Sequence, residues 1–429
     1  MNFFQNLHRD AKLLMASRGI RAFAFSYLNV VFAIYLNRLG YSTITIGVIF
    51  SVAYLSGALL TAVWGFLSDR YGRRRILMLL AVLTIISNGI FVFFSSLAFI
   101  LLAVIIANVG AGGSAGGGSG GGPFNPVEEA LLAEKCHPEN RNQIFAFNSF
   151  VGSVMGSVGA LAAGLPQYLQ EQWSWNAVTA YKPLFIATIV FSFLLLIVYG
   201  AISEGPSTHP AEKKISKATG VFVTKMSLLA FVDNFGAGLA GSLVSYWFFL
   251  RFGVELKSLG VMFFISNFLA ALSFLSAPII ARHLGIVRTM AFSHGLASLI
   301  YLSIPLAATF VGAATLLVIR SYFAYMDNPL RASFTMAMVK SNERGSAAGV
   351  TSLARVVPFG ISPTISTYLM QSVSLTLPLF IGGGLQLVND VAFYLMFRSV
   401  RPPEEERTYN PLPASLSSPT TRGRTQEGD

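Results

Sequence analysis

Residues 64–76 read Trp-Gly-Phe-Leu-Ser-Asp-Arg-Tyr-Gly-Arg-Arg-Arg-Ile and separate two long apolar stretches of the chain. Charged side chains in so short a connection must face water, lipid headgroups or each other. The positions that set the pattern are Gly65, Asp69, Arg70, Gly72, Arg73, Arg74 and Arg75. A basic turn that follows the positive-inside rule would account for the arginines, but it gives no reason for Gly65, Asp69 and Gly72.

The composition is that of a protein embedded in a membrane. Of the 429 residues, 54% are hydrophobic and 11% are charged, whereas soluble proteins carry about 25% charged residues. The mean hydropathy is +0.62. The net charge of +11 lies in the gaps between apolar stretches. We therefore interpret it as membrane topology and expect a lipid bilayer, and no nucleic acid, as the partner.

The sequence gives no sign of an enzyme. Its single cysteine, Cys136, excludes an intrachain disulfide, and no zinc-type spacing surrounds it. Walker lysine, His-Glu-x-x-His and Gly-x-Ser-x-Gly motifs do not occur. We expect neither catalysis nor a bound cofactor or metal.

Twelve windows are long and apolar enough to cross a hydrocarbon core of about 30 Å. They cover residues 18–38, 45–68, 75–95, 97–122, 142–165, 182–202, 222–250, 258–281, 287–308, 311–337, 346–370 and 376–398. Residues 1–16 are expected to form a short amphipathic segment that lies on the membrane face. The expected fold is an all-α membrane protein with 12 transmembrane helices in two pseudo-symmetric six-helix halves.

The distribution of basic residues predicts the orientation. With the N-terminus in the cytoplasm, cytoplasmic segments hold 23 of the 30 Lys and Arg residues. The outer loops hold four, which are Arg38, Lys182, Arg251 and Lys257, and Arg320, Arg331 and Arg355 fall inside spans. This bias predicts a multi-pass protein with both termini cytoplasmic.

An internal repeat supports two halves. Five residues recur 213 positions later, namely Arg38, Gly40, Gly47, Gly72 and Arg75, as Arg251, Gly253, Gly260, Gly285 and Arg288. Asn125-Pro126 and Arg141 recur 203 positions later as Asn328-Pro329 and Arg344. We therefore predict an N-terminal half over residues 1–202, a polar cytoplasmic linker over 203–220, a C-terminal half over 221–401 and a disordered tail over 402–429.

Residues 110–122 consist of glycine, alanine and serine. Their composition is typical of a flexible linker, but their place in the repeat favours a glycine-packed fourth helix. Both interpretations stay open.

Charged residues inside the predicted spans are the candidate functional groups, because each is costly in lipid. Arg320, Asp327 and Arg331 share one helical stripe and should face the other half, a water cavity or an opposite charge. Asp233-Asn234 lies in the seventh span, and Arg21 is the repeat equivalent of Asn234. Asp233 is a candidate proton or cation site, or it is a structural group that caps a helix end or pairs with Arg21. The remaining candidates are Arg355 and a gate formed by Glu128, Glu129 and Arg331, in which the two glutamates could pair with the arginines of residues 64–76. His294 is expected to be a satisfied polar residue.

The spacing Gly65-x3-Asp69-Arg70-x-Gly72-Arg73-Arg74-Arg75 resembles the signature loop between helices 2 and 3 of major facilitator superfamily transporters. Two further stretches, residues 124–134 and Met326-Asp-Asn-Pro-Leu-Arg331, are similar to a prokaryotic, general or drug-efflux-like branch. The resemblance implies alternating access about a central site that is lined by the first helix of each half. It also implies that the signature loop stabilises one end state.

We therefore expect a monomeric secondary transporter in the cytoplasmic membrane that exports small amphipathic molecules against protons. Drug–proton antiporters of the superfamily carry a Gly-Pro motif in helix 5, but no proline follows Gly156 here. A solute importer of the same fold is the alternative, and a non-transporting membrane sensor is the third possibility.

Overall fold

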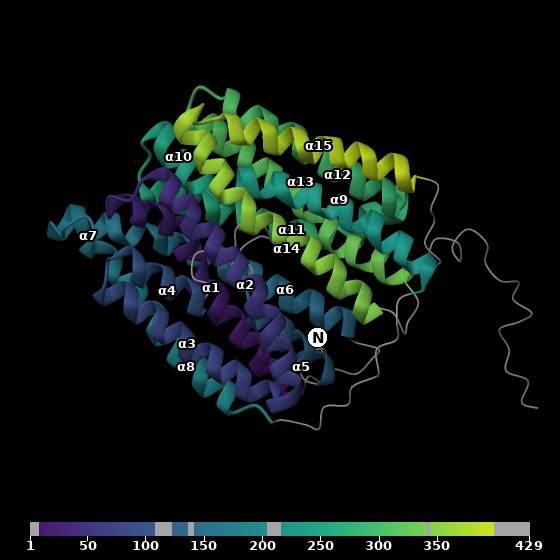
Figure 1. Cartoon of the computed structure of the whole chain (residues 1–429), viewed down its shortest axis with the longest axis horizontal. Coiled ribbons are helices and arrows are strands. Elements are labelled where there is room, and N and C mark those ends of the chain that lie inside the picture. Colours follow the sequence, from purple (N-terminus) through teal and green to yellow (C-terminus); the bar gives the residue numbers. More distant parts are fainter. Residues whose placement is uncertain (1–7, 108–121, 136–140, 204–215, 340–343, 399–429) are drawn as a thin grey trace, which may run out of the picture.

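The computed structural model describes residues 8–107, 122–135, 141–203, 216–339 and 344–398, and these residues form helices and no strand. The helices assemble into two bundles that lie side by side (Figure 1). The first bundle contains α1 (Arg9–Arg38), α2 (Thr43–Tyr71), α3 (Arg73–Phe93), α4 (Leu97–Ala107), α5 (Phe124–Glu134), α6 (Arg141–Leu161), α7 (Leu165–Trp173) and α8 (Lys182–Gly200). The second contains α9 (Lys217–Gly241), α10 (Val244–Phe252), α11 (Leu256–Leu284), α12 (Ile286–Ser303), α13 (Phe310–Met338), α14 (Arg344–Ser372) and α15 (Leu377–Phe397).

The prediction of twelve membrane crossings is confirmed. Within the described ranges, nine segments are long and apolar enough to cross a bilayer. The remaining three crossings are α13, α14 and the pair α4 and α5. These twelve crossings give the expected all-α architecture with two six-helix halves.

The leader predicted over residues 1–16 is wrong in the part that the structure describes. α1 begins at Arg9 and runs without a break to Arg38. Ala11, Leu14 and Met15 are buried in a cluster with residues of α3 and α5. Residues 9–16 therefore extend the first span, because their apolar face is needed in the core of the first half.

The described part of the fourth crossing consists of α4, whose last residue Ala107 is also the last described one, and α5. α5 begins at Phe124, in a stretch that we expected to lie outside the spans. Both helices pack on α2 and α3. Our two interpretations of residues 110–122 concern a stretch of which only Gly122 lies within the described residues.

The seventh crossing, expected as one helix over residues 222–250, is divided. α9 ends at Gly241 and α10 begins at Val244, because Leu243 leaves the helical conformation with φ −122° and ψ 24°. α9 begins at Lys217, so the last four residues of the predicted linker are helical.

The start of that linker is fixed to the first half. The backbone N–H of Ser203 donates to Oδ2 of buried Asp10 at 3.3 Å, and the Ser203 hydroxyl donates to the same oxygen. Nζ of Lys135 lies 3.2 Å from this oxygen. Residues 204–215 and the predicted tail over 402–429 lie outside the described part of the chain.

The internal repeat is visible in the contacts between the halves. In α2, a Cβ atom at Gly47 would lie 2.8 Å from the carbonyl oxygen of Pro363 in α14. In α11, a Cβ atom at Gly260, the repeat equivalent of Gly47, would lie 2.8 Å from the carbonyl oxygen of Ala160 in α6. Each half therefore presents a glycine of its second helix to the partner half, and only glycine permits this approach.

Polar contacts between the halves gather at the end of the molecule that carries α7 and α10, on the left in Figure 1. The Tyr246 hydroxyl lies 3.1 Å from Nδ2 of Asn37 and 3.1 Å from the Thr43 hydroxyl. The N–H of Ile44 donates to Oε1 of Gln371 at 3.2 Å. Tyr246 is buried within an apolar cluster that both halves share. We call this end the α10 end, and it is closed by these contacts.

Candidate functional site

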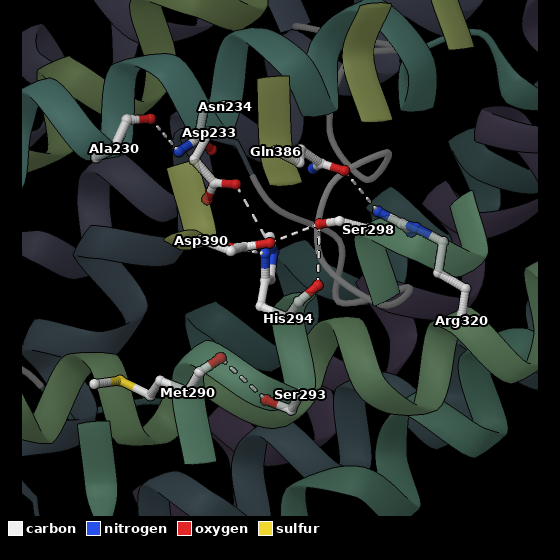
Figure 2. A network of polar contacts seen from close by, with 10 residues as sticks. All are labelled: Ala230, Asp233, Asn234, Met290, Ser293, His294, Ser298, Arg320, Gln386 and Asp390. Atoms are coloured by element: carbon white, nitrogen blue, oxygen red, sulfur yellow. Dashed lines mark hydrogen bonds and ion pairs between the residues drawn. The ribbon is translucent and has the colours of Figure 1, made fainter. Parts of the chain in front are cut away.

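Three helices of the second half bring two carboxylates and an imidazole together (Figure 2). Asp233 comes from the middle of α9, His294 from α12 and Asp390 from α15. α15 packs on both α9 and α12, which brings the three side chains together. All three helices are apolar on average, so charged groups at their middle positions are buried within the second half.

Asp390 holds the imidazole in place. Nδ1 of His294 lies 2.7 Å from Oδ1 of Asp390, and the Ser298 hydroxyl donates to Oδ2 at 2.7 Å. Nε2 of His294 points toward Asp233, whose Oδ1 lies 3.8 Å away. When Nδ1–H donates to Asp390, the neutral ring has its acceptor on Nε2, facing Asp233.

The exposed fraction of the side chain falls from Asp233 to His294 to Asp390. The side chain of Asp233 is 14% exposed, that of His294 is 10% exposed and that of Asp390 is 5% exposed. Asp233 is therefore the most exposed of the three side chains, and the imidazole separates it from a more deeply buried carboxylate. This arrangement can accept a proton at Asp233 and share it with His294.

Two other predicted residues of this half, Asn234 and Arg320, contact groups outside this cluster. Nδ2 of Asn234 donates to the carbonyl of Ala230 at 2.7 Å, within its own helix. The guanidinium of Arg320 lies 4.2 Å from the centre of the Tyr301 ring, and its Nη2 lies 3.5 Å from Oε1 of Gln386.

The stripe predicted on α13 is described only in part. Arg331 is buried with its guanidinium 5.3 Å from the centre of the Phe393 ring. The side chain of Asp327 lies outside the described atoms. Arg355 is half-buried on α14, which packs against α9.

A second polar cluster lies in the first half. Its members are Ser17, Arg18 and Arg21 of α1, Asn125 and Glu128 of α5, and Tyr199 of α8. Glu128 accepts from Ser17 at 3.0 Å, from Tyr199 at 2.5 Å and from Arg21. Nη2 of Arg21 also donates to Oδ1 of Asn125 at 2.8 Å.

This cluster corrects our expectation for Glu128. We expected it to pair with the arginines of residues 64–76, but its ion pair is with Arg21, which is fully buried. The reason is depth, since Glu128 occupies the buried face of α5 whereas Glu129, one position later, is exposed. Arg18 and Arg21, which we counted among the cytoplasmic charges, are likewise buried inside α1.

The signature loop is a one-residue turn. Gly72, with φ 99°, is the single residue between α2 and α3. Arg73 forms an ion pair with Glu134 at the end of α5. The guanidinium of Arg70 lies 5.6 Å from the centre of the neighbouring Tyr71 ring, and Arg74 is half-buried. The side chain of Asp69 is not among the described ones, and a Cβ atom at Gly65 would meet nothing within 4 Å.

Asp390, Ser298 and Tyr199 were not predicted as site residues. A signal existed for Asp390, because it is a carboxylate within the apolar window 376–398, which is the observation that singled out Asp233. For Ser298 and Tyr199 the sequence has no such signal, since neutral hydroxyl groups are common in membrane helices.

Comparisons with known proteins agree with this architecture. A family model described as Major Facilitator Superfamily matches residues 14–363. A yeast protein, the uncharacterized membrane protein YJR124C of Saccharomyces cerevisiae, is 23% identical over 435 residues, covering 92% of this chain and 96% of its own.

Solved structures show the same fold. A D-xylose-proton symporter superposes with a TM-score of 0.69 at 15% identity, covering 90% of this chain and 97% of its own. The nucleoside transporter NupG gives 0.67 at 15%, covering 91% and 100%. An inward-open conformation of the xylose transporter XylE from E. coli gives 0.70 at 14%, covering 93% and 99%.

Proposed function

Because the chain belongs to the major facilitator superfamily, we propose that it is a proton-coupled secondary transporter, working by alternating access, whose proton site is the cluster Asp233, His294 and Asp390. The family and the fold are those of transporters, and the chain is an integral multi-pass membrane protein. We propose export of small amphipathic molecules as the direction, with both termini cytoplasmic, in the cytoplasmic membrane and as a monomer.

The observation that supports proton coupling is the order of groups across α9, α12 and α15. Asp233 is the most exposed of the three, and Nε2 of His294 lies 3.8 Å from it. When a proton binds between them, either Asp233 becomes neutral or it forms an ion pair with the imidazolium of His294. Both states cost less free energy than a buried carboxylate beside a neutral ring. Asp390 stabilises the imidazolium form because it accepts from Nδ1 at 2.7 Å.

Transport in the opposite direction is the second candidate. Two structural neighbours are titled a D-xylose-proton symporter and a nucleoside transporter. A proton site in one half serves import and export equally, because the direction depends on which gradient is larger. The prokaryotic, general or drug-efflux-like branch of the superfamily remains our prediction. The yeast protein that is similar to this chain is eukaryotic.

We also propose roles for three other groups of residues. Asp69 and Arg70, at the end that carries the signature loop, act in the conformational switch and not in substrate binding. The ion pair of Glu128 and Arg21 holds α5 against α1 and acts as a gate. The same role falls to Arg331 on α13, which is the repeat equivalent of Glu128. Glu129 and Arg355 are charged groups that other charged side chains can contact when the two halves move during alternating access.

The test uses purified protein in proteoliposomes with an imposed pH gradient, membrane potential or both. A panel of dyes, sugars, nucleosides and organic acids first identifies a substrate of the parent. Asp233→Asn and His294→Gln should then abolish accumulation driven by the pH gradient and preserve gradient-free exchange. Glu255→Gln, which removes an exposed carboxylate at the start of α11, is the matched control. Full pH-driven accumulation by both site variants would disprove the proton assignment.

A further inference from the structure

We infer that the turn between α11 and α12 is a binding surface for an anionic phospholipid, whose phosphate is held by Arg282 and Arg288. This partner is separate from the transported molecule, so its binding depends neither on the proton site nor on the direction of transport. Three features of the turn support it, namely its charge, the exposure of its arginines and the apolar faces that lead to it.

The turn carries exposed positive charge. Arg282 and His283 lie in the last turn of α11, Gly285 alone separates the two helices, and Arg288 is the third residue of α12. All three basic side chains are exposed, and within the described residues none of them forms an ion pair. The sequence has no Asp or Glu over residues 256–326, so neither helix supplies a carboxylate that could neutralise them.

Exposed apolar faces lead to this turn along both helices. They consist of Leu272, Leu275 and Ile279 on α11 and of Phe292, Leu296 and Leu299 on α12. Successive members are three or four residues apart, so each series lies on one face of its helix, and Arg282 and Arg288 continue the two series at the same spacing. Such faces contact the acyl chains of lipids, and arginines at their ends reach the headgroups.

The position of the turn agrees with this partner. Arg288 lies in the first turn of the crossing Ile286–Leu306 and is therefore at the membrane surface. α11 starts at the α10 end, beside α7, and its 29 residues carry the chain across the membrane to Leu284. The distribution of basic residues predicts that this second end faces the cytoplasm, where the leaflet is rich in anionic lipids.

The chemistry of the surface selects among ligands. Guanidinium groups bind phosphate oxygens with two parallel hydrogen bonds. A zwitterionic headgroup brings an ammonium group close to the same two cations, whereas an anionic headgroup does not. Inorganic phosphate would make the charged contacts but would leave the apolar faces uncovered. The surface therefore suits an anionic phospholipid better than either alternative.

The first half provides an internal comparison. Arg288 is the repeat equivalent of Arg75, which is also exposed, but Arg282 stands where Asp69 would repeat. The carboxylate of Asp69 lowers the positive charge of the first turn, and no acid does so in the second. The turn at Gly285 therefore binds an anionic lipid more tightly than the turn at Gly72.

The test is a lipid titration of delipidated protein in detergent, in which native mass spectrometry counts the bound lipids. Phosphatidylglycerol is the anionic probe and phosphatidylcholine is the zwitterionic one. The parent should bind its first phosphatidylglycerol several-fold more tightly than phosphatidylcholine. Arg282→Gln and Arg288→Gln should each weaken this binding about fivefold, and the double variant should weaken it further. The double variant with lysine at both positions keeps the charges and should retain most of the affinity.

Two controls have matched charge. Arg251→Gln/Lys257→Gln removes two positive charges from exposed positions at the α10 end and should leave the first phosphatidylglycerol bound as in the parent. Arg75→Gln, at the equivalent position of the first turn, should weaken it less than Arg288→Gln does. Unchanged unfolding temperatures in lipid-free detergent show that the variants are folded.

Four results would overturn the lipid surface. They are equal binding of the two lipids by the parent, unchanged binding in Arg282→Gln/Arg288→Gln, an equal loss in either control, and displacement of the lipid by an equal concentration of inorganic phosphate. None of them bears on proton coupling, because the titration involves no transport and no gradient.

Discussion

Gly72 and Gly285, which stand 213 residues apart, make the same turn in the two halves of the molecule. Each is the single residue between two long helices, with φ 99° and ψ 137° at Gly72 and φ 85° and ψ 153° at Gly285. Residues with a Cβ atom rarely adopt this conformation. The second turn lacks the acidic residue of the first, since Arg282 stands where Asp69 would repeat.

Replacing either glycine should therefore destabilise the protein. Gly72→Ala and Gly285→Ala should each cost about 1–3 kcal/mol, because alanine is strained at these backbone angles. Thermal unfolding of the purified variants measures the loss. Gly65→Ala is the matched control within the same motif, since it lies inside α2 with open space around it, and it should be neutral or gain up to about 1 kcal/mol. Equal losses at Gly65 and Gly72 would contradict the backbone explanation.

The ion pair of Arg21 and Glu128 should be strongly coupled. Glu128→Gln leaves a fully buried guanidinium without its carboxylate, and removing one partner of a buried pair costs about 3–5 kcal/mol. The double variant Arg21→Met/Glu128→Gln should lose less than the sum of the two single variants. Chemical unfolding of the four proteins of this cycle provides the coupling energy. Additive losses would mean that the pair does not act as a unit.

Tyr246 should stabilise closure of the α10 end. Tyr246→Phe keeps the ring in its apolar cluster and removes the hydroxyl contacts to Asn37 and Thr43, each worth about 1 kcal/mol. Cysteines at Ile44 and Gln371, introduced with Cys136→Ser, report closure by their rate of cross-linking. The rate should fall several-fold in Tyr246→Phe and stay unchanged in Tyr368→Phe, which alters an exposed tyrosine on α14. An unchanged rate in Tyr246→Phe would remove this residue from the closing contacts.

The bias of basic residues, 23 to four in the sequence and 21 to four without the buried Arg18 and Arg21, predicts that the α10 end faces the outside. Single cysteines at Gln172 and Lys257, again with Cys136→Ser, should react with an impermeant thiol reagent added outside. Both positions belong to the same end, since the N–H of Lys257 donates to Oε1 of Gln167 on α7, the helix that carries Gln172. Labelling from the cytoplasmic side alone would reverse the orientation.

Periodicity and glycine spacing predicted the architecture because both are local or repeated properties. The turn at Gly72 and its copy at Gly285 were visible as matching letters, and the structure gives them matching backbone angles. The break in the seventh crossing was not visible, because it depends on the backbone angles of one residue, Leu243, which hydropathy does not report.

The candidate sites were predicted only one residue at a time. Asp233 could be singled out as a carboxylate in an apolar window, but its partner His294 is 61 positions away and Asp390 is 157 away. Side-chain partners between helices depend on helix rotation and depth, which hydropathy does not report. Glu128 shows the same limit, since its position on the buried face of α5 decided that it meets Arg21 and not the signature loop.

The anchoring of Ser203 to Asp10 fixes where the connection between the halves starts, and Ser216 is where the second half begins. The twelve residues in between could span at most about 45 Å if fully extended. Within the described residues, the approach of the two bundles depends on the glycine contacts at positions 47 and 260, so the bundles meet as the subunits of a protein complex do.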